Sequence, residues 1–326
     1  MKPAYKKPHL SYQQQLDLLK QRGLTISNEQ DALRMLEVLG YYRLSGYLYP
    51  FRKFPALGTT PFRRLDEFIA GTTFQHAVDL YHFDSELKLL IMSAIEKIEV
   101  AVRAKIAYHM GGVDPFCYAN PVHLDPKFSK LRFHRVSGDP MPSYFDEWQK
   151  KFGENFTRSN EEFINHFRSN YAPPLPIWIA IEVWDFGLLS RFYAGLLHAD
   201  RIAVTPHFGL GSEESLFASW LRALNYLRNV CAHHSRLWNR SLVDQPKSPK
   251  RGMIPKLDHI VGQPHAMLHL YGILCILQHL LKQIDSNNVW GEKLKRLLAT
   301  FPTLPAVATL HAMGFPANWH NEALWN

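Results

Sequence analysis

Apolar residues recur every three or four positions along most of the 326-residue chain, the spacing of one face of an α-helix. The pattern predicts helices over 11–22, 27–47, 74–110, 146–170, 177–197, 213–240, 264–283 and 290–300. The longest of these is either one helix or two helices broken near residue 84, and its second half carries one buried stripe at 91, 95, 98, 102 and 106. Few segments read as strands, so the sequence predicts an all-α fold.

Proline, glycine and aspartate clusters separate these helices and indicate how the chain is organised. An N-terminal helical segment, 1–70, is expected to pack on the body of the protein. The core is expected over 71–245, with an irregular insertion at about 111–145. A basic linker containing prolines, 245–256, leads into the C-terminal helices of 246–326, whose aromatic tail is expected to dock on the body.

Charge narrows the class of partner, and cysteine usage indicates the compartment. The net charge of +8 and the pI of about 9.3 favour a polyanion, either a nucleic acid or an anionic membrane surface. The three cysteines are far apart and form no C-x-x-C pair, which is typical of a reducing compartment. The N-terminus lacks the apolar core of a signal peptide, and the longest apolar run, 271–281, is too short to span a bilayer. We therefore expect a cytoplasmic protein with no membrane association.

The segment "LRNVCAHHSRLWNR", 227–240, concentrates the chemistry-bearing side chains. On a helix, one polar stripe would hold Arg222, Asn225, Asn229, His233, Arg236 and Arg240. Asn229 and His233 are an i, i+4 pair, and Arg228 borders the stripe. His234 would lie off the stripe, about 100° round the helix from His233. The pattern is that of a packed helix with one polar face.

These residue types suit cleavage of an RNA phosphodiester without a metal ion. A histidine that titrates near neutrality can take a proton from the 2′-hydroxyl or give one to the leaving oxygen. An arginine can bind the phosphate and stabilise the charge that develops on it. A solvated polar stripe is the competing explanation and the commoner one in a basic chain with 17 histidines. Residue types and spacing alone leave both explanations open.

The spacing from Arg228 to His233, with a polar residue after the arginine, resembles the signature of HEPN-type ribonucleases. Six blocks in order resemble, more narrowly, the Abi-like abortive-infection proteins of the AbiD/AbiF group: "YYRLSGY", "LYHFDSEL", "IEKIEVAVR", "PIWIAIEVWDFGLLSRFY", "LRNVCAHHSRLWNR" and "MGFPANW". The arginine–histidine spacing is a weak signal, whereas the six ordered blocks are specific. They extend over most of the chain.

The resemblance implies a HEPN-like helical bundle with additional helices. It also implies an endoribonuclease that needs no metal or cofactor and arrests growth in phage defence. Arg228, Asn229 and His233 would be its catalytic residues, with His234 in a supporting role. Attack by the 2′-hydroxyl would give a cyclic phosphate.

Sites of this type are usually composite, and the sequence leaves two ways to complete one. A homodimer would pair two copies of 228–233, which is the alternative we favour. Within one chain, Arg103 and His109 could form a second element, although Ala104 stands where a polar residue is expected. Glu96, Glu99 and Arg103 could instead support the motif from behind. The competing explanation for Arg103 is a simple ion pair with Glu99, four residues earlier.

Two basic segments are candidate RNA-binding surfaces. In "KFSKLRFHR", basic and aromatic side chains alternate, which suits phosphates and unpaired bases: Lys127, Lys130, Arg132 and Arg135. Lys250 and Arg251 lie in the proline linker. The competing explanation is a solvated face with two buried phenylalanines. His265 and His269 have the i, i+4 spacing of metal ligands, but no third ligand accompanies them, so we expect no metal.

Three classes of function therefore compete. The first is a ribonuclease effector, acting as a toxin in a toxin–antitoxin arrangement. The second is a non-catalytic protein that uses the same basic surface to hold a structured RNA. The third is a purely structural helical scaffold. A toxin must be restrained, and a structured regulatory RNA would suit the basic surface.

Overall fold

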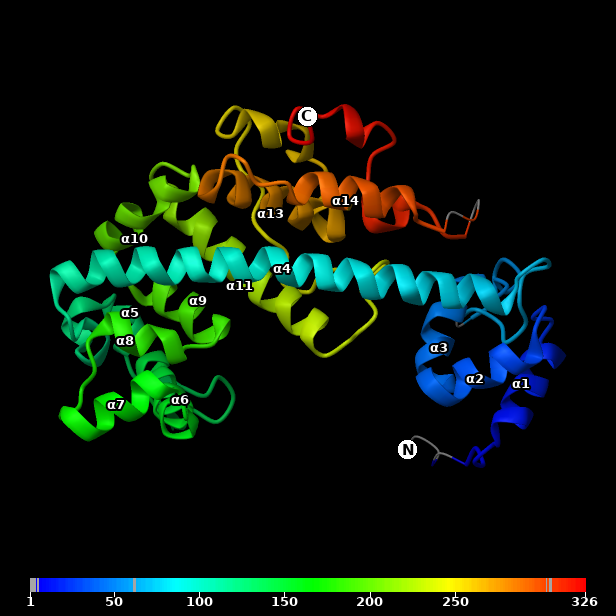
Figure 1. The fold of residues 1–326 in the computed structure, drawn as a ribbon, viewed down its shortest axis with the longest axis horizontal. Coiled ribbons are helices and arrows are strands. Elements are labelled where there is room, and N and C mark those ends of the chain that lie inside the picture. The colour runs from blue at the N-terminus through cyan, green and yellow to red at the C-terminus, as the bar shows by residue number, and fades with distance from the viewer. Residues whose placement is uncertain (1–3, 5, 61–62, 303, 305–306) are drawn as a thin grey trace.

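The computed structural model describes residues 4, 6–60, 63–302, 304 and 307–326. The fold is all-α (Figure 1). Its α-helices are α1 (Tyr12–Gln21), α2 (Glu29–Leu39), α3 (Tyr41–Leu48), α4 (Phe74–Val113), α5 (Pro126–Ser129), α6 (Tyr144–Arg158), α7 (Glu162–Asn170), α8 (Ile177–Ala180), α9 (Phe186–Gly195), α10 (His198–Val204), α11 (Glu214–Ala232), α12 (Pro264–Leu268), α13 (Leu270–Ile284) and α14 (Trp290–Ala299). In the described residues the one sheet pairs β1 (Arg132–Phe133) with β2 (Pro140–Met141), antiparallel.

Helix α4 extends along the length of the molecule, and the helices that pack directly against it are α3, α8, α9, α10, α11, α13 and α14 (Figure 1). Helices α1–α3 lie near one end, α5–α9 at the other, and α11, α13 and α14 between them. The predicted stripe from residue 91 to 106 is at most 1% exposed, which confirms it. The alternative break near residue 84 is wrong, because α4 continues through that position and Asp84 is buried with hydrogen-bonding partners.

Capping residues set the ends of the N-terminal helices. Ser11 forms a capping box with Gln14 at the start of α1. Asn28 caps α2, since its side chain accepts from the amides of Gln30 and Asp31. The predicted helix over 27–47 is two helices, because Gly40 adopts φ 80° and turns the chain between α2 and α3.

The predicted insertion folds into short 3-10 turns, α5 and the β1–β2 hairpin, between α4 and α6. Phe128 of α5 packs over Gly195, where a Cβ atom would lie 2.7 Å from its ring. The indole of Trp148 donates to the carbonyl of Leu188, which ties α6 to α9. An aromatic cluster around Trp148 and Trp184 fills the space between these helices.

The prediction of one buried helix over 177–197 is wrong. The chain forms α8 and a 3-10 turn, Ile181–Val183, and then becomes extended at Trp184. Asp185 caps α9 by accepting from the amide of Leu188 at 2.8 Å. The N-cap needs non-helical backbone, so the cap and the continuous helix are incompatible. This break positions Asp185 beside α11.

The C-terminal region packs on the body through α14 and the tail. Helix α14 lies along α4, and the indole of Trp290 donates to the carbonyl of Leu90. The tail returns to α13, where Trp325 is 2% exposed and donates to the hydroxyl of Tyr271 at 3.3 Å. Across the described residues, no helix has both the length and the apolar character required to cross a membrane.

Candidate functional site

The motif begins in the last turns of α11, with Arg228 and Asn229, and continues into the turn that follows the helix. The predicted helix over 213–240 is wrong in its last two turns, because α11 ends at Ala232 and His233 is its C-cap. His233 still donates its amide to the carbonyl of Asn229, at 3.0 Å, so it keeps the position one turn beyond Asn229. His234 turns the chain with φ 53°, and both histidine side chains are exposed. Arg236 and Arg240 therefore leave the stripe that the helical pattern predicts.

A buried carboxylate holds the chain that follows the two histidines. Asp84 of α4 is fully buried and accepts from the amides of Leu237 and Trp238, the latter at 2.6 Å. It also accepts from the hydroxyl of Tyr47 at 2.7 Å and from the ammonium of Lys88 at 3.1 Å. These contacts fix the turn after α11, because the amides of an irregular buried segment need partners.

Helix α3 holds the same turn from a second side. The guanidinium of Arg43 donates to the carbonyl of His234 at 2.6 Å. Arg236 donates to the carbonyl of Gly46, and burial lowers the pKa of Arg236 despite the nearby hydroxyl of Tyr47 and carboxylate of Asp84. The N-terminal helices thus position the end of the motif, although α3 lies about 190 residues away in sequence.

Arg228 and Asn229 line a polar cavity of about 240 Å³, which we call the motif pocket. Its lining comes from α6, α9 and α11: Lys151, Asp185, Phe186, Gly187, Leu188, Arg191, Asn225, Arg228 and Asn229. Three cations, Lys151, Arg191 and Arg228, face one carboxylate there. The guanidinium of Arg228 donates to the side-chain oxygen of Asn229 at 3.4 Å. A pocket with this charge excess can hold a phosphate.

Asp185 organises the wall of the motif pocket. Its carboxylate pairs with the ammonium of Lys151 at 2.6 Å and accepts from the amide of Leu188. Burial acts to raise the pKa of Asp185, but these two partners outweigh it and the pKa is lowered. Gly187 leaves room there, since a Cβ atom would lie 3.1 Å from the carboxylate and 3.5 Å from the amide oxygen of Asn225.

A second cavity, of about 610 Å³, lies on the other side of Arg228 and is called here the Glu99 pocket. It is lined by Leu89, Met92, Ser93, Ile95, Glu96, Glu99, Val100 and Arg103 of α4 together with Arg228. The expected ion pair between Arg103 and Glu99 is confirmed at 2.5 Å. Burial raises the pKa of Glu99, opposed by the charges of Arg103 and Arg228. Glu96, Glu99 and Arg103 therefore lie together beside Arg228.

The possible second element, Arg103 and His109, lies apart from the motif pocket. Arg103 is engaged by Glu99, by the carbonyl of Trp184 at 2.6 Å and by Glu182 at 3.7 Å. His109 pairs with Asp200 of α10 at 2.8 Å. Neither residue lines the motif pocket, although Arg103 shares the Glu99 pocket with Arg228.

The basic side chains of the insertion and the linker lie on the surface, and most of those predicted to bind RNA are exposed. Lys127, Lys130 and Arg135 are exposed. Arg132 is not free, because it pairs with Glu147 and lies over the ring of Tyr144, 4.0 Å from its centroid. In the linker, Lys250 and Arg251 are exposed. Of the two phenylalanines, Phe128 is partly buried, as the competing explanation expects, but Phe133 is 63% exposed.

The remaining candidate ligands have structural partners. His265 contacts the carbonyl of His311 at 2.8 Å, and His269 contacts the carbonyl of His265 at 2.9 Å. In the part of the chain that the structure describes, no three histidine, cysteine or acidic side chains are grouped as metal ligands. The three cysteines are buried and free, and burial raises the pKa of Cys231 to about 12.

Residue types and spacing missed four residues that shape the site: Asp84, Lys151, Asp185 and Arg191. Asp84 carried a usable signal, since an aspartate four residues before a lysine in an apolar helix indicates a buried ion pair. Asp185 stands before a glycine-containing turn of helix and fits an N-cap. Nothing local distinguishes Lys151 or Arg191 from other surface cations.

Comparison with known proteins places the chain in a family. A family model described as Abi-like protein matches residues 34–239, more than half of the chain, from α2 to the end of the motif. The search of curated proteins found no match, and the search of solved structures found none. The matched range contains every residue of the motif pocket and the Glu99 pocket. The chain belongs to the Abi-like protein family, a membership that suggests a role in abortive infection, a defence against phage.

Proposed function

We propose that this protein is a metal-independent endoribonuclease that acts as the effector of an abortive-infection response. One observation carries the proposal: Arg228 and Asn229 line a polar pocket with two further cations, and an exposed histidine of the same motif stands one helical turn away. Family membership supports the defence role. The arrangement supports the chemistry, because the phosphate-binding groups of the pocket lie one helical turn from a proton-transfer group, His233.

In the proposed reaction the scissile phosphate occupies the motif pocket. Arg228 binds its non-bridging oxygens, with Lys151 and Arg191 adding positive charge. His233 takes the proton of the 2′-hydroxyl as that oxygen attacks phosphorus. The bond from phosphorus to the 5′-oxygen breaks, leaving a 2′,3′-cyclic phosphate and a 5′-hydroxyl. Asn229 holds the ribose or orients the histidine.

One copy of the motif offers a single histidine, His233, one helical turn beyond Asn229, yet the reaction moves two protons. We propose that a second copy of the chain supplies the other proton-transfer group, so that the working enzyme is a homodimer. Within this scheme Glu96, Glu99 and Arg103 hold Arg228 from the side of α4. The exposed cations of the insertion and linker bind flanking RNA or a structured regulatory RNA.

The test compares wild type with Arg228→Ala, His233→Ala and the control Arg222→Ala on labelled RNA in EDTA. Arg222 lies on the same helix six residues before Arg228, and its side chain is 61% exposed. We expect cleavage to cyclic-phosphate ends by wild type and Arg222→Ala. Each motif variant should lose roughly 10²–10⁴-fold in rate, the usual contribution of such groups.

Other outcomes separate the competing functions. If all four proteins retain RNA equally and none cleaves it, the protein is an RNA binder and the ribonuclease proposal fails. If the two motif variants unfold while Arg222→Ala does not, the motif is structural. Absorbance at 260 nm, checked beforehand, shows whether a co-purified RNA blocks the site, and such RNA is removed before the assay.

A further inference from the structure

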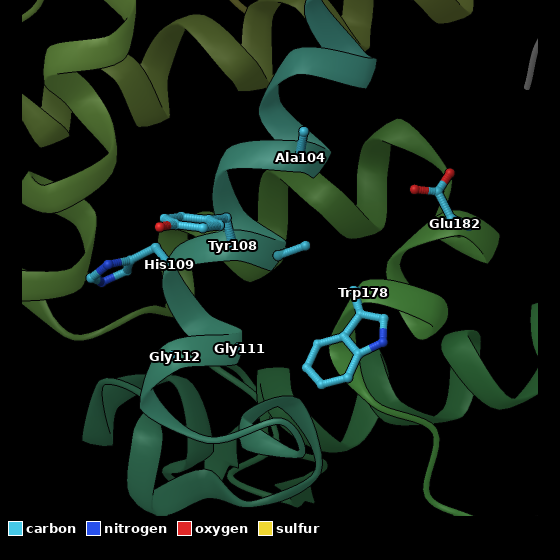
Figure 2. A pocket seen from close by; sticks show the side chains of 8 residues that line it. Ala104, Tyr108, His109, Gly111, Gly112, Trp178 and Glu182 are labelled. Atoms are coloured by element: carbon cyan, nitrogen blue, oxygen red, sulfur yellow. The ribbon is translucent and has the colours of Figure 1, made fainter.

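A third cavity, of about 720 Å³, lies between the end of α4 and α8. We call it the aromatic pocket, and it is lined by Ala104, Ala107, Tyr108, His109, Gly111, Gly112, Trp178 and Glu182. Figure 2 shows Trp178 and Glu182 on one side and Ala104 and Gly111 of α4 on the other, with the Tyr108 and His109 rings turned away from Trp178. Trp178 is 52% exposed and Tyr108 is 86% exposed. Large aromatic side chains this exposed add little to the core.

The indole of Trp178 is held in place although half of it is exposed. A Cβ atom on Gly111 would lie 3.2 Å from the indole carbon Cε3, so the ring packs directly on the backbone of α4. The neighbouring residue, Ile177, is fully buried and donates its amide to the carbonyl of Pro115 at 2.7 Å. A ring fixed in this way offers a stacking surface at little cost in conformational entropy.

The aromatic pocket and the motif pocket lie at two ends of one short segment. Glu182 lines the first and Asp185 lines the second, and three residues span at most about 11 Å. Arg103 fixes the segment between them, since its guanidinium donates to the carbonyl of Trp184 and pairs with Glu182. One nucleic-acid strand can therefore reach from the phosphate site to the exposed rings.

We propose that the aromatic pocket binds an unpaired nucleobase of the RNA strand whose phosphate occupies the motif pocket. The inference rests on the proposed function for the identity of the ligand. The base stacks on Trp178, as unpaired bases do on exposed aromatic side chains. The carboxylate of Glu182 accepts from the amino group of the base. The net charge of +8 and the cations of the motif pocket favour such a polyanionic strand.

The test measures binding without cleavage. The probe is a single-stranded 2′-O-methyl RNA octanucleotide, whose blocked 2′-oxygen cannot attack phosphorus. Its matched control is an octamer with the same phosphates and abasic sugars. Full-length wild type, Trp178→Ala, Trp178→Phe and Tyr42→Ala are compared by fluorescence anisotropy. Tyr42 is 91% exposed on α3 and serves as the remote aromatic control.

We expect Trp178→Ala to weaken binding of the base-containing probe by roughly 5- to 150-fold, the usual range for one stacked base. Binding of the abasic octamer should not change. Trp178→Phe keeps a ring and should recover most of the affinity, which a simple loss of folding would not allow. Tyr42→Ala should match wild type.

Equal affinity of wild type and Trp178→Ala for the base-containing probe would overturn the proposal, as would failure of wild type to bind it. If Trp178→Ala instead abolishes a concentration-dependent dimer in sedimentation and leaves RNA affinity unchanged, a second copy covers the pocket and the proposal is wrong. The ribonuclease proposal fails separately: a wild type that binds the blocked probe through Trp178 but never cleaves RNA would keep this inference and refute that activity.

Discussion

Replacing Asp84 with asparagine should destabilise the protein by about 3–5 kcal/mol. The substitution keeps the shape of the side chain but leaves the ammonium of Lys88, whose side chain is 8% exposed, without its buried counter-charge. Breaking a buried pair from one side typically costs that amount. The asparagine also cannot accept from all of the donors that converge on the carboxylate, the hydroxyl of Tyr47 and the amides of Leu237 and Trp238.

The free energy of unfolding is measured by urea denaturation followed by circular dichroism. The double variant Asp84→Asn, Lys88→Met should be more stable than Asp84→Asn alone, because no unpaired cation stays buried. The control Lys20→Met removes an exposed pair with Glu29, at 2.7 Å, and should cost about 0–1 kcal/mol. A loss below about 1 kcal/mol for Asp84→Asn, or a double variant less stable than the single one, would refute the reasoning.

Two further predictions follow from the same structure. Burial lowers the pKa of His279 to about 4, so the folded protein keeps this side chain neutral, and about 3 kcal/mol of stability is lost as the pH falls from 6.5 toward 4. In His279→Gln the unfolding midpoint should therefore vary less with pH over that range. A pH dependence equal to that of wild type would contradict the assignment. If the active species is a homodimer with a shared site, mixing inactive Arg228→Ala with inactive His233→Ala should restore part of the ribonuclease activity, and a mixture as inactive as its components would argue for a site within one chain.

Much of the fold follows from local sequence. The isoleucine and valine stripe of α4 is buried where the periodicity placed it, because helical spacing alone decides which residues share a face. The helix 213–240 was predicted too long for a complementary reason. Its polar spacing continues through Arg236. After His233, however, the amide of Trp238 binds Asp84 and the guanidinium of Arg236 binds the carbonyl of Gly46, and these contacts hold the chain in a non-helical conformation.

The candidate site divides in the same way. Arg228, Asn229 and His233 are recognisable from their spacing. Glu96, Glu99 and Arg103 on α4 could also be predicted, because they follow a helical pattern of their own. Lys151 and Arg191 were not recognisable, since they come from two other helices and differ from surface cations only through where α6 and α9 pack. The aromatic pocket likewise depends on the packing of α8 against α4.

By itself, the sequence determined the all-α class, the buried stripe of residues 91–106, the basic charge and the identity of the motif. These properties depend on composition and on spacing within one or two helical turns. Only the tertiary structure decided where α11 ends, which cations share the motif pocket with Arg228, and that the aromatic pocket lies close to the motif pocket. Those features join residues far apart in sequence, and packing rather than local periodicity brings them together.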